Sequence, residues 1–243
     1  MSEIRYPRIL PAAECSIIVE FGNEISNEIN ALISGFTSAL GDSIPGIVEV
    51  IPTFRSALIT YDPRVINYEL LCRLVKEKLG TISARSQEKK RIVEIPVCYG
   101  GKHGPDLSFV AKHAGLSKKE VIRIHSSRSY LIYMLGFQPG FPYLGGLDPR
   151  IFTPRLQSPR TLIPAGSVGI GGEQTGLYPV ASPAGWQIIG TTPVRAYNPH
   201  KEPAIPYEAG DHIRFVPISE EEFLEIEALE KKNAYTFKVV ESE

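Results

Sequence analysis

The stretch from residue 136 to residue 193 limits the fold of this 243-residue chain more than any other part of the sequence. It holds 11 of the 21 glycines, nine of the 20 prolines and no lysine. Because proline cannot donate a hydrogen bond to a sheet and glycine weakens a strand, strands here must be short and turns frequent. Many short strands with dense turns predict a barrel or a sandwich, and they argue against a helical or doubly wound domain.

The first part of the chain has a different pattern, in which short apolar runs alternate with helical periods. Apolar residues at helical spacing predict one helix that begins after Ser26 and ends at Gly41, and a second from Asn67 to Gly80. Strands are expected at 16–21, 47–51 and 57–61. The order strand, strand, helix, strand, strand, helix predicts a ferredoxin-like α+β sandwich, with both helices on one face of an antiparallel sheet.

A polar, charged and aperiodic segment separates this region from the rest of the chain. We therefore expect residues 1–85 to form the N-terminal domain and residues 86–91 to form a linker. Residues 92–243 would form the C-terminal domain.

The predicted C-terminal domain begins with a strand at 92–98, where Pro96 favours an edge position in the sheet. Asp106 is placed to cap one short helix, and Ser117 with Glu120 predicts a capping box for the next. The remaining expected elements are a strand at 130–135, the glycine-rich strands, a strand at 212–216, a helix capped by Ser219 and Glu222, and a polar strand at 235–240.

Charge and hydropathy exclude several classes of partner. Lys and Arg number 26 against 27 Asp and Glu, so the net charge of −1 gives no reason to expect binding to nucleic acid or to an anionic membrane. No apolar run approaches the roughly 20 residues that a membrane helix needs. The N-terminus lacks the basic start and apolar stretch of a signal peptide, so we expect a cytoplasmic protein.

Several standard catalytic and cofactor motifs are absent. The sequence has no P-loop and no nucleophile elbow, and the glycine run at 169–176 lacks the spacing and the following helix of a dinucleotide site. Cys15, Cys72 and Cys98 are far apart and form no C-x-x-C pair, and the five histidines show no metal-binding spacing. We therefore expect neither disulfides nor a structural metal, and no haem.

The glycine-rich stretch also carries an unusual set of polar and aromatic residues. Two arginines can hold a carboxylate or phosphate with paired donors, and glycine lets a ligand approach backbone N–H groups. Ser and Gln side chains can orient an amide, and aromatic rings can wall a pocket. The candidate catalytic residues are Arg155, Arg160 and Gln174, and the candidate substrate-binding residues are Phe141, Tyr143, Gly166, Ser167, Tyr178 and Trp186.

A simpler interpretation of the same residues stays open. Glycine and proline can brace a barrel whose aromatic residues form its core and whose arginines lie on its surface. Trp186 fits such a core as well as a ligand wall. His125, at the end of a predicted helix, is typical of a structural residue, although a general-base role is the alternative.

The sequence resembles the allophanate hydrolase subunit 1 family, which includes the B subunit of 5-oxoprolinase and KipI-type kinase inhibitors, and whose module also occurs in urea carboxylase. The resemblance covers essentially the whole chain. The segments that carry it are Ile95–Gly100, Gly104–Leu107, Tyr133–Leu147, Thr153–Arg155, Ser158–Arg160, Pro164–Gly169, Gln174–Pro179 and Gly185–Gln187.

The resemblance implies a ferredoxin-like N-terminal domain followed by a cyclophilin-like β-barrel of the carboxyltransferase type. It also implies a heteromeric complex with two partners, the homologous barrel protein known as the C subunit and the A subunit. Such a complex uses ATP as a co-substrate, with or without Mg, to convert the small molecule 5-oxo-L-proline to L-glutamate. A homodimer through an edge strand of the N-terminal domain is a further option.

Three functions follow from the resemblance. The first is the B subunit of an ATP-dependent 5-oxoprolinase, which works together with its partner subunits. The second is a KipI-like inhibitor of a sensor histidine kinase, for which the Phe141-Pro142-Tyr143 loop would be a protein interaction surface. The third is a carboxyltransferase-like subunit that acts on urea or allophanate; the chain has no Met-Lys-Met biotin-carrier segment, so no biotin is expected on it.

Overall fold

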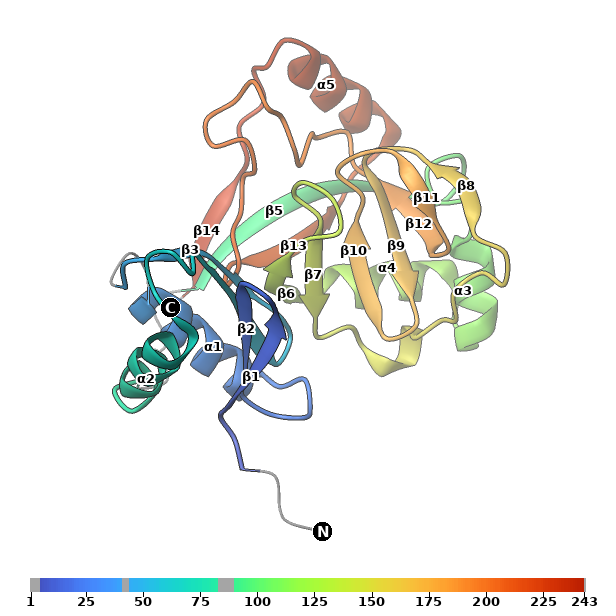
Figure 1. Cartoon of the computed structure of the whole chain (residues 1–243). Helices are drawn as coiled ribbons and strands as arrows, with labels where there is room; N and C mark the ends of the chain where they lie inside the picture. Colours follow the sequence, from blue (N-terminus) through green and yellow to red (C-terminus); the bar gives the residue numbers. More distant parts are fainter. Residues whose placement is uncertain (1–4, 41–43, 83–89, 243) are drawn as a thin grey trace. The chain divides into compact units, whose positions relative to one another are not determined.

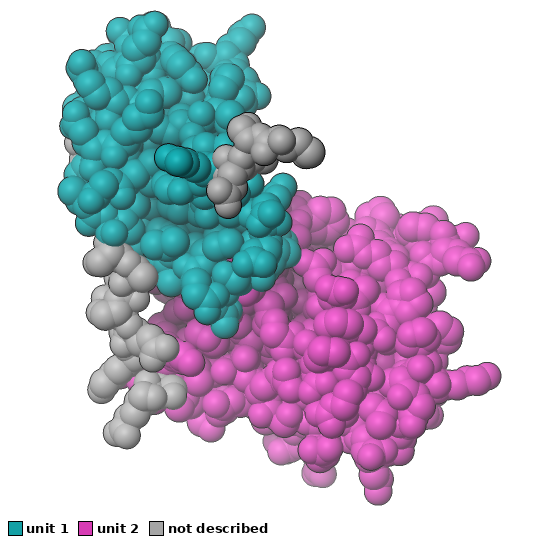
Figure 2. Space-filling model, turned by 90° about the horizontal axis from the view of Figure 1, so that it is seen from below, with its two compact units in different colours: residues 1–88 teal, residues 89–243 magenta. Residues whose placement is uncertain are grey.

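The chain forms two compact units, residues 1–88 and residues 89–243, which Figure 2 shows in different colours. The structure is a computed structural model that describes residues 5–40, 44–82 and 90–242. Lys90 and Arg91, which the sequence placed in the linker, begin a strand and pair with the last strand of the chain. Because their partner strand is far away in the sequence, only the local polarity of these residues could be used, and polar residues are typical of a linker. The remaining domain boundaries stay a prediction.

The described residues of the N-terminal unit form four strands and two helices in the expected order (Figure 1). They are β1 (Arg8–Ala13), β2 (Ser16–Glu20), α1 (Asn27–Leu40), β3 (Ile47–Pro52), β4 (Ser56–Tyr61) and α2 (Tyr68–Leu79). Strand β1 was not located from the sequence, since Pro7 and Pro11 interrupt its pattern. The end expected for the first helix at Gly41 lies outside the described residues.

One face of this sheet and both helices share a single core. The strands pair antiparallel in the order β1-β2-β4-β3. Ile17 and Val19 alternate with more exposed neighbours on β2, as in a strand with one buried face. Phe36 of α1 and Leu71 of α2 are fully buried in the same cluster. The assignment of this unit to the ferredoxin-like folds stays a prediction.

In the C-terminal unit, residues 90–242 form ten strands, three α-helices and one short 3-10 helix. They are β5 (Lys90–Tyr99), α3 (Leu107–Ala114), α4 (Lys118–Ser126), β6 (Ser129–Leu135), β7 (Pro142–Gly145), η2 (Pro149–Ile151), β8 (Arg160–Ile163), β9 (Ser167–Gly171), β10 (Gln174–Leu177), β11 (Ser182–Ala184), β12 (Gln187–Thr191), β13 (His212–Pro217), α5 (Glu220–Lys231) and β14 (Val239–Ser242). The last strand is shorter and begins later than the sequence indicated.

Seven of these strands close into a barrel. They follow the order β12-β9-β10-β7-β6-β13-β5, and β5 pairs again with β12. Strand β14 pairs with the first residues of β5, on the side opposite β13. Strand β8 forms a separate two-stranded sheet with β11. The dense glycines and prolines predicted a barrel or a sandwich, and the structure shows the barrel that the resemblance implied.

The edge position expected from Pro96 is wrong, because β5 is an inner strand. One side of β5 pairs in parallel with β13 along its length. Its other side pairs with β14 only as far as Val93 and with β12 only from Cys98 onward. Pro96 falls in the gap between these two partners, where its missing N–H costs no hydrogen bond.

Helices α3 and α4 pack against the barrel and share its main core. Leu107, Val110 and Val121 of the helices belong to the same buried cluster as Ile95 of β5 and Phe215 of β13. The capping box predicted for α4 is present, with Ser117 and Glu120 bonded to each other's backbone. No described helix is long and apolar enough to cross a membrane.

His125 is a buried, neutral side chain, and each of its ring nitrogens forms one hydrogen bond inside the C-terminal unit. Thr175 Oγ1 donates to the Gly169 carbonyl oxygen at 2.9 Å, so it accepts from Nε2–H of His125, 2.7 Å away. Nδ1 then accepts from the Tyr99 hydroxyl at 2.8 Å. The ring stacks on Phe215 with centroids 4.7 Å apart, and burial lowers the pKa of His125 to about 3. The structural interpretation of His125 fits this setting, because neither ring nitrogen is left for a substrate.

We expect His125 to make folding sensitive to acid. Its pKa is about 3 in the folded chain and 6.5 in the reference state, so the unfolded chain binds the extra proton between these values. Its contribution to stability is complete above about pH 6.5 and is lost as the pH falls toward 3. Urea titrations between about pH 6 and pH 4 give the slope of the free energy of unfolding against pH. We expect this slope to be smaller for His125→Gln than for the wild type, by up to about 1.4 kcal/mol per pH unit.

Nuclear magnetic resonance of the wild-type ring gives a check that does not require the variant to fold. At pH 5 the nitrogen shifts of His125 should be those of the neutral Nε2–H form. A protonated His125 ring at pH 5 in the folded chain would contradict this account.

Candidate functional site

Four of the predicted aromatic residues meet in a second, smaller core at one part of the barrel. Phe141 directly precedes β7, Tyr178 follows β10 and Trp186 precedes β12. Their ring centroids lie 5.5 to 5.9 Å apart in edge-to-face contacts, and the Tyr143 ring lies 5.2 Å from that of Phe141. Such contacts stabilise aromatic clusters beyond the area they bury.

This aromatic cluster is packed and not open. Phe141, Tyr178 and Trp186 are 2 to 6% exposed, and only Tyr143 of the four is partly exposed. Burial raises the pKa of the Tyr178 hydroxyl, so this group stays protonated. The aromatic core foreseen as the simpler interpretation therefore describes these three rings, and Tyr143 is the one ring with surface left for a ligand.

Glycines in the predicted ligand-binding run instead make room for the indole of Trp186. A Cβ on Gly171 would overlap atoms Cδ1 and Nε1 of that ring. A Cβ on Gly176 would lie 3.3 Å from its Cζ3 atom. These glycines on β9 and β10 permit close packing of the ring against the strands.

Arg155 lies exposed on the outer side of this cluster. Its guanidinium carbon is 5.8 Å from the centre of the Trp186 ring, within the range of a cation–π contact. Within the described parts of the chain, no carboxylate forms an ion pair with Arg155. Its donors are therefore available to an anionic ligand.

Arg160 is held in place by the protein itself. Its Nη2 lies 2.7 Å from Asp106 Oδ1, and its Nη1 donates to the Trp186 carbonyl oxygen at 3.2 Å. The other oxygen of Asp106 accepts from the backbone N–H of Ile188 at 2.6 Å. These three contacts tie the start of α3 to β8 and β12. The two predicted arginines thus meet at Trp186, but only Arg155 is free to bind a ligand.

Asp106 does not act as the helix cap predicted from the sequence. It occupies the N-cap position of α3, yet its side chain makes no capping hydrogen bond. The Arg160 guanidinium and the Ile188 N–H compete for the same carboxylate, and these partners lie 54 and 82 residues away.

The backbone donors at Gly166 and Ser167 are used inside the fold. Gly166 has φ +83° and donates to the Tyr178 carbonyl oxygen at 2.7 Å. Ser167 is 2% exposed, and its N–H points to the Pro164 carbonyl oxygen at 3.3 Å. The predicted cradle of backbone donors is therefore not open at these residues. Gln174 begins β10, opposite Gly171, and is partly exposed.

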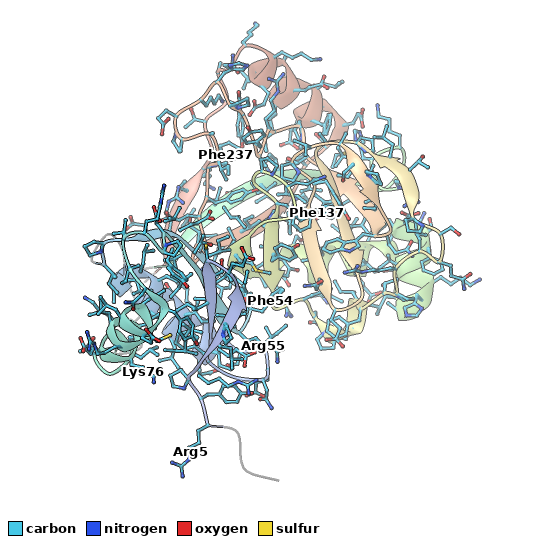
Figure 3. All side chains as sticks on the ribbon, viewed as in Figure 1. Arg5, Phe54, Arg55, Lys76, Phe137 and Phe237 are labelled. Carbon is cyan, nitrogen blue, oxygen red and sulfur yellow. The ribbon has the colours of Figure 1, made fainter. Side chains whose placement is uncertain are left out.

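Two further residues near the aromatic cluster stand out in the loop between β6 and β7. Phe137, labelled in Figure 3, has φ 64° and is 63% exposed. Gln138 N–H donates to the Gly136 carbonyl oxygen at 2.7 Å, which makes Phe137 the centre of a strained γ-turn. Gln138 Oε1 is buried without a hydrogen-bond partner. The nearby Pro139-Gly140 pair indicated a turn, but nothing local indicated a left-handed phenylalanine.

Comparison with known proteins places this barrel in a family. Residues 7–207 match the family described as carboxyltransferase domain, subdomain C and D. The chain belongs to this family. The B subunit of 5-oxoprolinase from Bacillus subtilis (strain 168) is 44% identical over 231 residues, which are 90% of this chain and 96% of the relative. A protein of the same name from Escherichia coli O157:H7 is 47% identical over 178 residues, which are 73% of this chain and 81% of the relative.

Relatives with carboxylase names are more distant. A putative urea carboxylase of Emericella nidulans is 30% identical over 216 residues, which are 75% of this chain but 17% of that protein. The solved structure of TTHA0988 superimposes with a TM-score of 0.75 at 36% identity, over 84% of this chain and 40% of that one. Kluyveromyces lactis urea carboxylase gives a TM-score of 0.79 at 24% identity, over 96% of this chain and 24% of that one, which shows the shared fold. This carboxyltransferase-family chain is thus a mixed α/β protein with a closed seven-strand barrel.

The two arginines should respond differently to truncation. Arg160→Ala leaves Asp106 without its charge partner, so we expect the free energy of unfolding to fall by about 1–2 kcal/mol. Arg155→Ala should change it by no more than about 0.5–1 kcal/mol, because an exposed cation–π contact is weak. Urea denaturation of the two variants tests this, and a larger loss for Arg155→Ala would contradict the assigned roles.

The strained turn at Phe137 leads to a second prediction about stability. In ordinary backbone, glycine is less stable than alanine by roughly 0.5–1 kcal/mol. At Phe137 the order should reverse, because only glycine tolerates this φ without strain. We expect Phe137→Gly to unfold at a higher urea concentration than Phe137→Ala, although both lose the same ring. Equal midpoints, or the usual order, would show that the left-handed turn is not retained in solution.

Proposed function

We propose that this chain is the B subunit of an ATP-dependent 5-oxoprolinase, a complex that converts 5-oxo-L-proline to L-glutamate. The observation that carries the proposal is the 44% identity to a 5-oxoprolinase B subunit over 96% of that relative's length. Identity of this extent covers both units of the chain, and not the barrel alone.

The chemistry of the reaction fits a surface that offers a cation to an anion. A lactam carbonyl is a poor electrophile, and transfer of the γ-phosphoryl group of ATP to its oxygen makes it a good one. ADP then leaves, water opens the ring and phosphate departs. Groups that hold the phosphoryl oxygens lower the barrier to the first step. Arg155 is the candidate for this role, because its donors are unpaired within the described residues and it is exposed beside Trp186.

The same geometry supports activity only within a complex. Arg160 is tied to Asp106, the three inner rings are packed together and the donors near Gly166 are used internally. One free arginine is too little to bind ATP and a lactam together. We infer that the remaining groups come from two partner proteins of the complex, the homologous barrel C subunit and the A subunit.

The test is ATP hydrolysis that depends on 5-oxoproline, measured on the complex reconstituted with the partner subunits. We expect Arg155→Ala to lower kcat by about 10²-fold, the usual loss when one donor to a transition-state oxyanion is removed. Arg155→Lys should recover part of the rate, since it keeps the charge but loses the paired donors.

Arg123→Ala, on the exposed face of α4, is the matched control and should turn over like the wild type. Unchanged turnover in Arg155→Ala would remove the site assignment. No 5-oxoproline-dependent hydrolysis in the wild-type complex would remove the function itself.

A second candidate is a subunit that acts on urea or allophanate, and the similarity to the Emericella nidulans protein favours it. Urea and allophanate added to the same assay distinguish the two, because one complex should show a strong preference for one substrate. The kinase-inhibitor alternative rests on the family resemblance alone, and binding of this chain to a sensor kinase would be needed to support it.

Three structural expectations and the cellular location stay proposals. The N-terminal unit would be a ferredoxin-like sandwich, which its antiparallel order β1-β2-β4-β3 supports. Its edge strands β1 and β3 offer free backbone groups for a homodimer. The barrel would be of the cyclophilin-like type, and the complex would work in the cytoplasm.

A further inference from the structure

A cluster of three potential metal ligands lies on the C-terminal unit, apart from the residues of the proposed active site. Cys98 stands near the end of β5, His103 follows in the turn toward α3, and Glu220 is the first residue of α5. His103 Nε2 lies 2.7 Å from Glu220 Oε2, and Cys98 Sγ lies 4.0 Å from the same oxygen. One ligand atom from each residue lies within 4.8 Å of the others.

The turn that carries His103 is fixed by its own backbone. Gly100 and Gly101 both have positive φ, which bends the chain back over the end of β5. His103 N–H donates to the Gly100 carbonyl oxygen at 3.0 Å, and its carbonyl oxygen accepts from Thr191 Oγ1 at 2.8 Å. The imidazole packs on Phe223 of α5 with centroids 4.4 Å apart. Cys98 and His103 are therefore held on rigid elements, as a preorganised site requires.

We propose that Cys98, His103 and Glu220 form a binding site for a divalent transition-metal ion of the zinc class. A thiolate, an imidazole and a carboxylate are the ligand types that zinc takes, and the sulfur selects against magnesium and calcium. Zinc bonds of about 2.0–2.3 Å in a tetrahedron place ligand atoms about 3.5 Å apart, so small side-chain movements suffice. Three protein ligands leave a fourth position for water or another molecule.

Charge at the cluster is consistent with a cation. Lys102 Nζ lies 2.6 Å from Glu220 Oε1, so the carboxylate already attracts positive charge there. The Lys102 side chain is 73% exposed and can move into solvent when a metal ion takes its place. Binding replaces the thiol proton of Cys98, which is released to water.

No metal site was expected from the sequence, because no histidine or cysteine pair has metal-binding spacing. The ligands are far apart in the chain, since Glu220 comes 122 positions after Cys98. Only the parallel pairing of β5 with β13, which leads directly into α5, brings Glu220 to the end of β5.

Cobalt titration of the purified full-length chain tests the site, because Co²⁺ binds like zinc and reports its ligands by colour. We expect one cobalt per chain, a near-ultraviolet thiolate-to-cobalt charge-transfer band, and displacement by zinc. Cys98→Ser should abolish the band and weaken binding at least about tenfold, whereas the control Cys72→Ser on α2 should keep both.

Glu220→Gln is a second variant that should fold, because Glu220 is exposed at the start of its helix. It should keep the thiolate band and bind cobalt at least about tenfold more weakly. Thermal melts with zinc should show a rise in Tm for the wild type and little rise for Glu220→Gln. Cobalt bound without a thiolate band, no cobalt bound, or a band that persists in Cys98→Ser would overturn the proposal.

Discussion

The indole of Trp186 occupies space at the barrel wall that only glycine leaves open, and the residues of the candidate site are arranged around this ring. Gly171 and Gly176 lie against it, Phe141 and Tyr178 meet it edge to face, and Arg155 lies beside it. A side chain at Gly171 would displace the ring and with it the neighbouring aromatics. Packing against this ring therefore explains Gly171 and Gly176, whereas Arg155 beside the ring stays exposed.

Pairing of charges decides which of the two nearby arginines can serve a ligand. Arg160 is partly buried and bonded to a carboxylate that also holds the Ile188 N–H. Releasing it would leave a carboxylate with little solvent around it, which is costly. Arg155 has no such partner within the described residues, so it can turn toward an anion at small cost. Two residues in near-identical sequence settings, Thr-Pro-Arg and Ser-Pro-Arg, thus have different parts in the structure.

The sequence predicted those features that depend on local pattern. Composition was enough to predict a barrel or a sandwich, helical spacing was enough for α1 and α2, and the spacing of Ser117 and Glu120 was enough for the capping box of α4. Features that depend on distant partners were missed or misjudged. Pro96 looked like an edge residue because its two partial partners lie at β12 and β14. Asp106 looked like a helix cap because Arg160 is 54 residues away.

The loop at Phe137 joins local strain to surface exposure. Phe141 N–H donates to the Gln138 carbonyl oxygen at 3.0 Å, and the Tyr207 hydroxyl donates to the Gly140 carbonyl oxygen at 2.7 Å. These bonds hold both ends of the turn, so the left-handed phenylalanine persists although it costs free energy. The Phe137 ring meets Phe141 edge to face, with centroids 5.5 Å apart, but most of it is in solvent, and Gln138 Oε1 lacks a donor. Because the fold already holds this turn, a group that covers the ring and donates an N–H to Gln138 Oε1 would not have to supply the free energy of forming it.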